Sequence, residues 1–163
     1  MRRLVILLSM CLLMCCVLCS CGTVNGYKKK DLVPVNETLG SGSIQVFVVG
    51  QNEEKGVMVK IKNLTDDVFY YGEYYSIQIF IEGVWYYVPT EEEFVVHDLA
   101  HELQPGMSYV ETYSLAPYGG KLNPGHYRIA CCDIGNNKNI HYAEFNVMAN
   151  GRYQFEIIEP TVA

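Results

Sequence analysis

Apolar and polar residues alternate along most of the chain after residue 42. In residues 57–62, for example, every second residue is β-branched, a period of two that is typical of a strand with one buried face. The irregular segment 90–102 allows a short strand at residues 94–96 or one helical turn near Asp98. The whole pattern predicts an all-β, antiparallel β-sandwich of about eight or nine short strands separated by polar turns. The predicted strands are residues 44–49, 57–62, 68–71, 74–82, 84–88, 109–114, 127–134, 140–148 and 152–158.

The turn at Glu82-Gly83 decides which residues of the neighbouring strands share a face. If these two residues form the whole turn, Ile81 lies opposite Val84, and the two faces follow by alternation. The isoleucine face is the better core, which leaves the other face on the outside of the sheet. The first face holds Ile77, Ile79, Val84, Tyr86 and Val88, and the second holds Phe80, Trp85 and Tyr87.

A tight turn leads into the predicted strand at residues 127–134. Pro124 fixes its own φ angle near the turn value, and Gly125 permits a positive φ. A tyrosine that opens a strand after such a turn can send its ring into the core and its hydroxyl back to the upstream backbone. This arrangement is the tyrosine corner of Ig-like sandwiches. We therefore expect Tyr127, Pro124 and Gly125 to form a structural corner.

Three signals follow one another in a fixed order along the chain. They are the aromatic hairpin at residues 74–89, the Leu-x-Pro-Gly turn at residues 103–106, and the Leu-x-Pro-Gly-x-Tyr-Arg-Ile segment at residues 122–129. In this order they resemble a family of bacterial Ig-like domains, which occurs in surface lipoproteins and in extracytoplasmic parts of sensor-type proteins of Gram-positive bacteria. The resemblance implies an Ig-like β-sandwich over residues 42–163 and a place at the cell surface. It brings no catalytic residue.

The N-terminal residues 1–20 have the pattern of an export signal. Two arginines precede an apolar run at residues 4–18, which is too short and ends too abruptly for a stable transmembrane helix. The run ends in Leu18-Cys-Ser-Cys21, which resembles the lipobox of bacterial lipoproteins. The resemblance implies cleavage before Cys21 and lipid attachment to its sulfur. Two acyl chains would hold the protein on the extracytoplasmic face of the bacterial cell membrane. A plain secretory signal is the alternative.

Residues 21–41 are polar and mixed, and we expect them to form a flexible tether. The segment contains three consecutive lysines, Lys28, Lys29 and Lys30. They could hold the tether against anionic head groups, or they are solvated charges of a linker. The formal net charge of the chain is −6. Such an acidic chain is unsuited to nucleic acid, and charge alone would not hold the whole protein on an anionic membrane.

Five of the seven cysteines lie within residues 1–21, which leaves only the adjacent pair Cys131 and Cys132 in the domain. Neighbouring residues of a strand point to opposite faces, so this pair cannot join two sheets. The domain must therefore depend on its apolar core. We expect Cys131 to be a small buried residue, with a strained vicinal disulfide as the alternative.

The only cluster with metal-ligand chemistry lies at residues 97–102. His97 and His101 would meet on one face of a helix, where Asp98 or Glu102 could add an oxygen ligand. The order is not His-Glu-x-x-His, and the Leu-x-Pro-Gly turn follows at once, which favours solvated loop histidines. A small-ligand or metal-binding lipoprotein is thus the alternative function. Because no nucleophile motif or phosphate-binding loop is present in the sequence, we expect neither catalysis nor a cofactor.

Residues 69–87 contain six tyrosines, two phenylalanines and the only tryptophan. Rings on an outer sheet face offer large contact area at small entropic cost and suit recognition of a protein, a peptide or a glycan. Phe80, Trp85 and Tyr87 are therefore the candidate binding surface. Aromatic residues also favour strands for packing alone, and a register shift of one residue would bury Trp85 in the core. The sequence thus predicts a non-catalytic, membrane-anchored Ig-like binding or accessory module.

Overall fold

The computed structural model describes residues 23–37, 42–52, 56–91, 99–133, 140–149 and 156–157. These residues form strands, turns and two short 3₁₀ helices, and none of them lies in an α-helix. This content confirms the predicted all-β fold class. The strands are β1 (Thr23–Val24), β2 (Tyr27–Lys28), β3 (Val33–Pro34), β4 (Ile44–Gln51), β5 (Val57–Asn63), β6 (Phe69–Ile81), β7 (Val84–Tyr87), β8 (Ala100–Leu103), β9 (Ser108–Tyr113), β10 (Gly125–Asp133), β11 (Ile140–Val147) and β12 (Glu156–Ile157), and the 3₁₀ helices are η1 (Lys29–Asp31) and η2 (Ala116–Tyr118).

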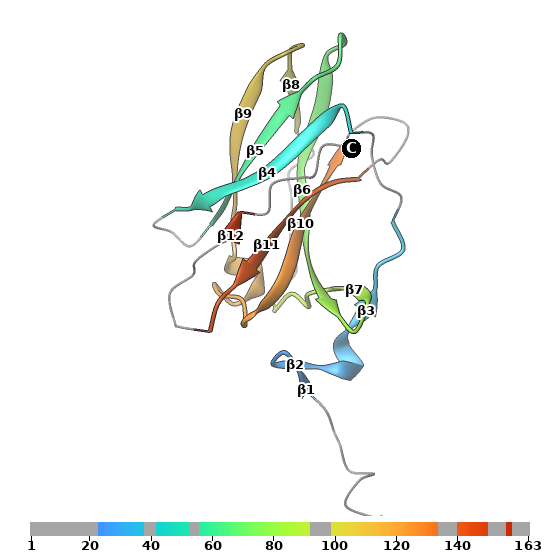
Figure 1. The fold of residues 1–163 in the computed structure, drawn as a ribbon, viewed down its shortest axis with the longest axis vertical. Helices are drawn as coiled ribbons and strands as arrows, with labels where there is room; N and C mark the ends of the chain where they lie inside the picture. The colour runs from blue at the N-terminus through green and yellow to red at the C-terminus, as the bar shows by residue number, and fades with distance from the viewer. Residues whose placement is uncertain are drawn as a thin grey trace, which may run out of the picture.

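Two antiparallel sheets face each other in the domain (Figure 1). The small sheet has the order β4-β5-β9. The large sheet has the order β12-β11-β10-β6-β7-β3, and β8 pairs with the first half of β6. Strand β4 of the small sheet packs against β11 of the large one. The two layers form the antiparallel Ig-like sandwich that the sequence predicts.

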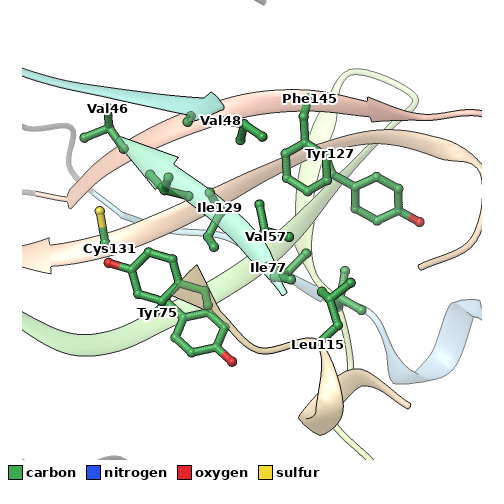
Figure 2. Close-up of a cluster of buried hydrophobic side chains, with 14 of the residues drawn as sticks. Val46, Val48, Val57, Tyr75, Ile77, Leu115, Tyr127, Ile129, Cys131 and Phe145 are labelled. Atoms are coloured by element: carbon green, nitrogen blue, oxygen red, sulfur yellow. The ribbon is translucent and has the colours of Figure 1, made fainter. Parts of the chain in front are cut away.

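The core lies between the two sheets (Figure 2). Aliphatic side chains of β4 and β5 meet the isoleucines of β6 and the apolar face of β10 and β11. In β5 and β11 buried residues alternate with less buried ones, so the period of two in the sequence corresponds to the inner and outer faces. The fully buried side chains include Val48, Val57, Val59, Ile61, Ile77, Ile79, Leu115, Tyr127, Ile129 and Phe145.

Strand β6 is longer than the sequence indicates, and β8 was not predicted. Residues 68–71 and 74–82 were expected to be two strands, but β6 is continuous through Gly72. Its first half pairs with β8 and its second half with β10 and β7. Strand β8 has a single buried apolar residue, Leu103, and therefore shows too little alternation to be recognised from the sequence. The strand or turn expected at residues 94–98 lies outside the described residues.

The corner at the start of β10 brings a buried ring next to backbone. Tyr127 is 0% exposed, and its hydroxyl donates a hydrogen bond of 2.7 Å to the carbonyl oxygen of Asn123. This is the geometry of a tyrosine corner. Gly125 does not have the positive φ that we expected. It is instead close to its neighbours, because a Cβ there would lie 3.0 Å from Nδ2 of Asn25 and 3.2 Å from the Tyr127 ring.

Residues 23–37, which we call the N-terminal strap, pack against the domain. Val24, Tyr27 and Leu32 lie against the core, and β3 pairs with β7 at the edge of the large sheet. This packing differs from the flexible tether expected over residues 21–41. The sequence did not show it because the apolar contacts are irregularly spaced and are made with distant parts of the chain. The domain boundaries themselves stay predictions.

Candidate binding surface

The hairpin β6-β7 has the register that its two-residue turn predicts. Ile81 pairs with Val84, and Phe80 pairs with Trp85. Because Ile79 points into the core, Phe80 and Trp85 lie on the outer face of the large sheet, where Phe80 is 37% exposed and Trp85 is partly exposed. Of the two interpretations of Trp85, the structure favours the outer surface. Val84 was expected to be a core residue, but it is 41% exposed at the tip of the hairpin.

Three rings converge on this outer face. The Phe80 and Trp85 ring centroids are 5.0 Å apart, and the His126 ring lies 5.2 Å from Trp85 and 5.6 Å from Phe80. Nε2 of His126 lies 2.9 Å from Oε2 of Glu144 on the adjacent strand β11. The separations are those of tilted and edge-to-face aromatic pairs, which pack favourably without a covering layer.

Arg128 lies between two aromatic rings next to this group. Its guanidinium carbon is 4.3 Å from the centroid of Trp85 and 4.4 Å from that of Tyr142. Its Nε donates a hydrogen bond of 2.5 Å to Oε1 of Gln78, and only 7% of the residue is exposed. Each cation–π contact contributes about 0.5–2 kcal/mol. The outer face thus carries an ordered cation held by rings from two other strands.

Burial lowers the pKa of the Arg128 guanidinium from its usual value, because desolvation disfavours the charged form. Tyr142, Glu37 and Glu144 oppose this effect and raise the pKa. An arginine starts far above neutral pH, so Arg128 keeps its charge under physiological conditions.

Tyr87 lies outside the ring cluster, in a chain of hydrogen bonds at the strap side of the sheet that Gln78 connects to Arg128. Its hydroxyl donates a hydrogen bond of 2.5 Å to Oε1 of Glu37. The other oxygen of that carboxylate accepts a bond of 2.8 Å from Nε2 of Gln78, which also donates to Ser76 Oγ at 3.1 Å. Of the three predicted surface residues, Phe80 and Trp85 therefore come together, whereas Tyr87 fixes the N-terminal strap to the sheet.

Most of this surface was missed in the sequence, although its signal was present. The outward positions of β10 and β11 alternate with the buried positions that were recognised as core. What the sequence does not show is that these two strands lie beside the β6-β7 hairpin. We define the outer-face patch as Phe80, Trp85, His126, Arg128, Tyr142 and Glu144.

The weak metal candidates His101 and Glu102 lie in strand β8, neither on the helix that a metal site was taken to need nor in the solvated loop that the sequence favours. His101 and Glu102 are consecutive residues of β8 and so point to opposite sides of the strand. His101 stacks on Tyr71 at 5.3 Å, and its Nε2 lies 3.4 Å from Oε1 of Glu73. Within the described ranges, no group of three metal-ligating side chains occurs. His97 lies outside those ranges.

Two other predicted residues concern lipid attachment and disulfide formation. Cys21 lies outside the described residues, so lipid attachment stays a prediction. Cys131 is buried, and its sulfur donates to the carbonyl oxygen of His141 at 3.5 Å. It packs as a small core residue, as expected, whereas the vicinal disulfide stays untested because the side chain of Cys132 lies outside the described residues. No helix in the described part of the chain is long and apolar enough to cross a membrane.

Two facing antiparallel sheets, together with a corner tyrosine at the start of β10, define an Ig-like β-sandwich. Comparison with known families agrees: the bacterial Ig-like domain family matches residues 46–146, more than half of the chain, and the chain belongs to this family. The match begins in β4 and ends in β11, so it excludes the N-terminal strap. Neither the curated proteins nor the solved structures compared with the chain contain a significant match.

Proposed function

We propose that this protein is a non-catalytic binding or accessory module, held by a lipid on Cys21 at the extracytoplasmic face of a bacterial cell membrane. Its outer-face patch binds a protein, peptide or glycan partner. Membership of the bacterial Ig-like family supports the module, and the lipobox supports the anchor. The single observation that carries the binding role is Arg128 held between Trp85 and Tyr142 beside the half-exposed ring of Phe80.

The outer-face patch is organised before any partner arrives. Its rings and its cation contact one another across strands β6, β7, β10 and β11, so few rotamers remain to be frozen on binding. Immobilising a free side chain costs about 0.5–1.5 kcal/mol at an interface. Rigid aromatic groups around an arginine are the residue types that dominate binding energy in protein interfaces. The patch therefore fits recognition of a partner that offers an apolar or aromatic contact group.

The charged groups near the patch are held by hydrogen bonds to neighbouring side chains. Arg128 binds Gln78, the carboxylate of Glu37 accepts from Gln78 and Tyr87, and His126 contacts Glu144. Such pairing holds side chains in place, which supports a role in positioning a partner rather than in proton transfer.

The experiment that tests this function places a photo-crosslinking benzoylphenylalanine at residue 80 of the full chain in its own cells. We expect a covalent adduct from this position. The matched control carries the same group at Phe47, a partly buried residue on the outer face of the small sheet. Adducts of equal yield from both positions, or from neither, would contradict a protein or peptide partner at the patch.

Glycan binding can be followed by tryptophan fluorescence, because Trp85 in the patch is the only tryptophan of the chain. Titration with soluble cell-surface glycans should change the intrinsic emission of Trp85 if they bind the patch. Replacing Tyr142 with Ala removes one ring beside Arg128 and should weaken that response. A flat emission across the titration, together with the absence of an adduct at residue 80, would rule out the binding role.

A further inference from the structure

Four lysines gather at the end of the domain where the described chain begins. Lys28 ends β2, Lys29 and Lys30 lie in η1, and Lys121 follows η2. All four are exposed, and Lys28 and Lys121 line the same hollow of about 260 Å³. We call these four residues the basic pole. Figure 1 shows β1, β2 and η1 at one end of the long axis, with β8 and β9 at the other.

The basic pole is fixed to the sandwich. The hydroxyls of Tyr27 and Tyr127 lie 3.1 Å apart, which links the N-terminal strap to the corner tyrosine. Gly26, at φ +82°, lies so close to the side chain of Asn123 that a Cβ would be 2.6 Å from its nearest atom. At the other end of the strap, the amide of Val35 donates to the Trp85 carbonyl at 2.9 Å. The lysines therefore have a defined position on a folded surface.

The proposed lipid anchor, on which this inference rests, brings the pole close to the bilayer. Strand β1 begins at Thr23, two residues after Cys21. Two extended residues span at most about 7 Å. Electrostatic attraction to the membrane extends about 8–10 Å at physiological salt. The folded strap therefore begins within the range of the head-group charge.

The local charge has the sign that an anionic surface attracts. Lys28 and Lys121 line the hollow together with two acids, Asp31 and Glu91, and Lys29 and Lys30 in η1 add two further positive charges. The chain as a whole has a net charge of −6, so the basic pole is opposite in sign to the rest of the protein. Acids further away than a Debye length are screened from the membrane and oppose the contact little.

We propose that the basic pole lies against the anionic head groups of the membrane that holds the lipid anchor. This contact orients the long axis of the sandwich away from the bilayer, so that β8 and β9 lie at the end farthest from the membrane.

The test measures how fast each lysine is acetylated by an amine-reactive reagent, with mass spectrometry as the readout. The acylated protein, cleaved before Cys21, is purified from bacterial membranes and reconstituted into neutral phosphatidylcholine vesicles or into vesicles containing phosphatidylglycerol. We expect Lys28, Lys29, Lys30 and Lys121 to react several-fold more slowly on the anionic vesicles. Lys60 and Lys62, on the outer face of the small sheet, are internal controls and should react equally on both. High salt, which shortens the Debye length to about 3 Å, should remove the difference.

Two results separate this inference from the proposed function. If Cys21 carries its lipid but the four lysines react equally on both kinds of vesicle, the anchor stands and the membrane contact is overturned. If the mass of the intact protein shows no lipid, the anchor is contradicted. The membrane contact of the basic pole is then measured by flotation with anionic vesicles. There the variant K28Q/K29Q/K30Q should lower binding on the order of 100-fold, at about fivefold per lysine, whereas K60Q/K62Q should leave it unchanged. Equal binding of both variants would overturn the contact.

Discussion

The two faces of the large sheet differ in how they are covered. On the inner face, Ile77, Ile79 and Ile129 are fully buried against the small sheet. On the outer face, Arg128 reaches a similar burial of 7% exposed, although no second layer lies over it in the described structure. Its cover comes from side chains of neighbouring strands. Adjacent residues of one strand can therefore have two roles: one packs in the core between the sheets, and the next forms an ordered outer surface.

The two faces also differ in what a substitution removes. An inner side chain leaves a cavity that the two sheets can close only partly, and the lost contacts add to the lost burial. An outer side chain leaves space that water can fill, so the free energy of unfolding changes less. If the outer-face patch exists for recognition, its substitutions should affect binding more than stability.

The largest effect is expected for Phe145→Ala in β11. Phe145 is 0% exposed and stacks on the ring of Tyr127, with centroids 5.8 Å apart. Truncating a buried phenylalanine costs about 3–5 kcal/mol of unfolding free energy. Urea denaturation followed by circular dichroism measures the loss. A cost below about 1 kcal/mol would show that the interior next to the corner is loosely packed.

The next prediction concerns the buried tyrosines of the inner side. Burial raises the pKa of Tyr71 and of Tyr118 to about 12, with Glu111 adding to the effect at Tyr71 and a backbone hydrogen bond from Ile77 opposing it at Tyr118. Burial also raises the pKa of Tyr75 and Tyr113 above the usual value of 10.0. These tyrosines are therefore still protonated in the folded protein at a pH where the unfolded chain has already lost its protons.

The sign of the pH dependence follows from this difference. The stabilising contribution is complete below pH 10 and is lost as the pH rises toward 12 and beyond. The free energy of unfolding should fall by about 1.4 kcal/mol per pH unit for each such tyrosine. Urea midpoints measured from pH 8 upward test this, and Tyr113→Phe should make the alkaline slope shallower. An unchanged slope in that variant would contradict the assignment.

The sequence predicted those features of the fold and surface that depend on local pattern. Alternation identified most of the strands, and the two-residue turn after Ile81 correctly paired Phe80 with Trp85. Strand β8 escaped detection because three of its four residues are outside the core. The role of Arg128 in the patch was not predicted, because its hydrogen bond joins it to Gln78, fifty positions away. The local alternation of residues does not show which distant strands become neighbours.

The N-terminal strap shows the same limit. Its composition indicates a tether, and its folding depends on contacts with Asn123 and Tyr127 that lie about one hundred residues away. Gly125 is instructive for a different reason. The expectation of a positive φ at Gly125 is wrong; what leaves little room for a side chain there is the close approach of Asn25 and the Tyr127 ring. Sequence pattern thus defines elements better than it defines their contacts.

The smallest effect on stability is expected for Phe80→Ala, the outer-face counterpart of Phe145→Ala. Phe80 is 37% exposed, so its removal forfeits part of its contacts with Trp85 and His126 but opens no interior cavity. We expect a loss below about 1 kcal/mol of unfolding free energy in urea denaturation, because substitutions at exposed positions seldom cost more. The emission of Trp85 should shift toward that of a more solvated indole, since Phe80 is its cross-strand partner. A loss as large as that of Phe145→Ala would mean that the outer face is a second core, and the binding surface would have to lie elsewhere.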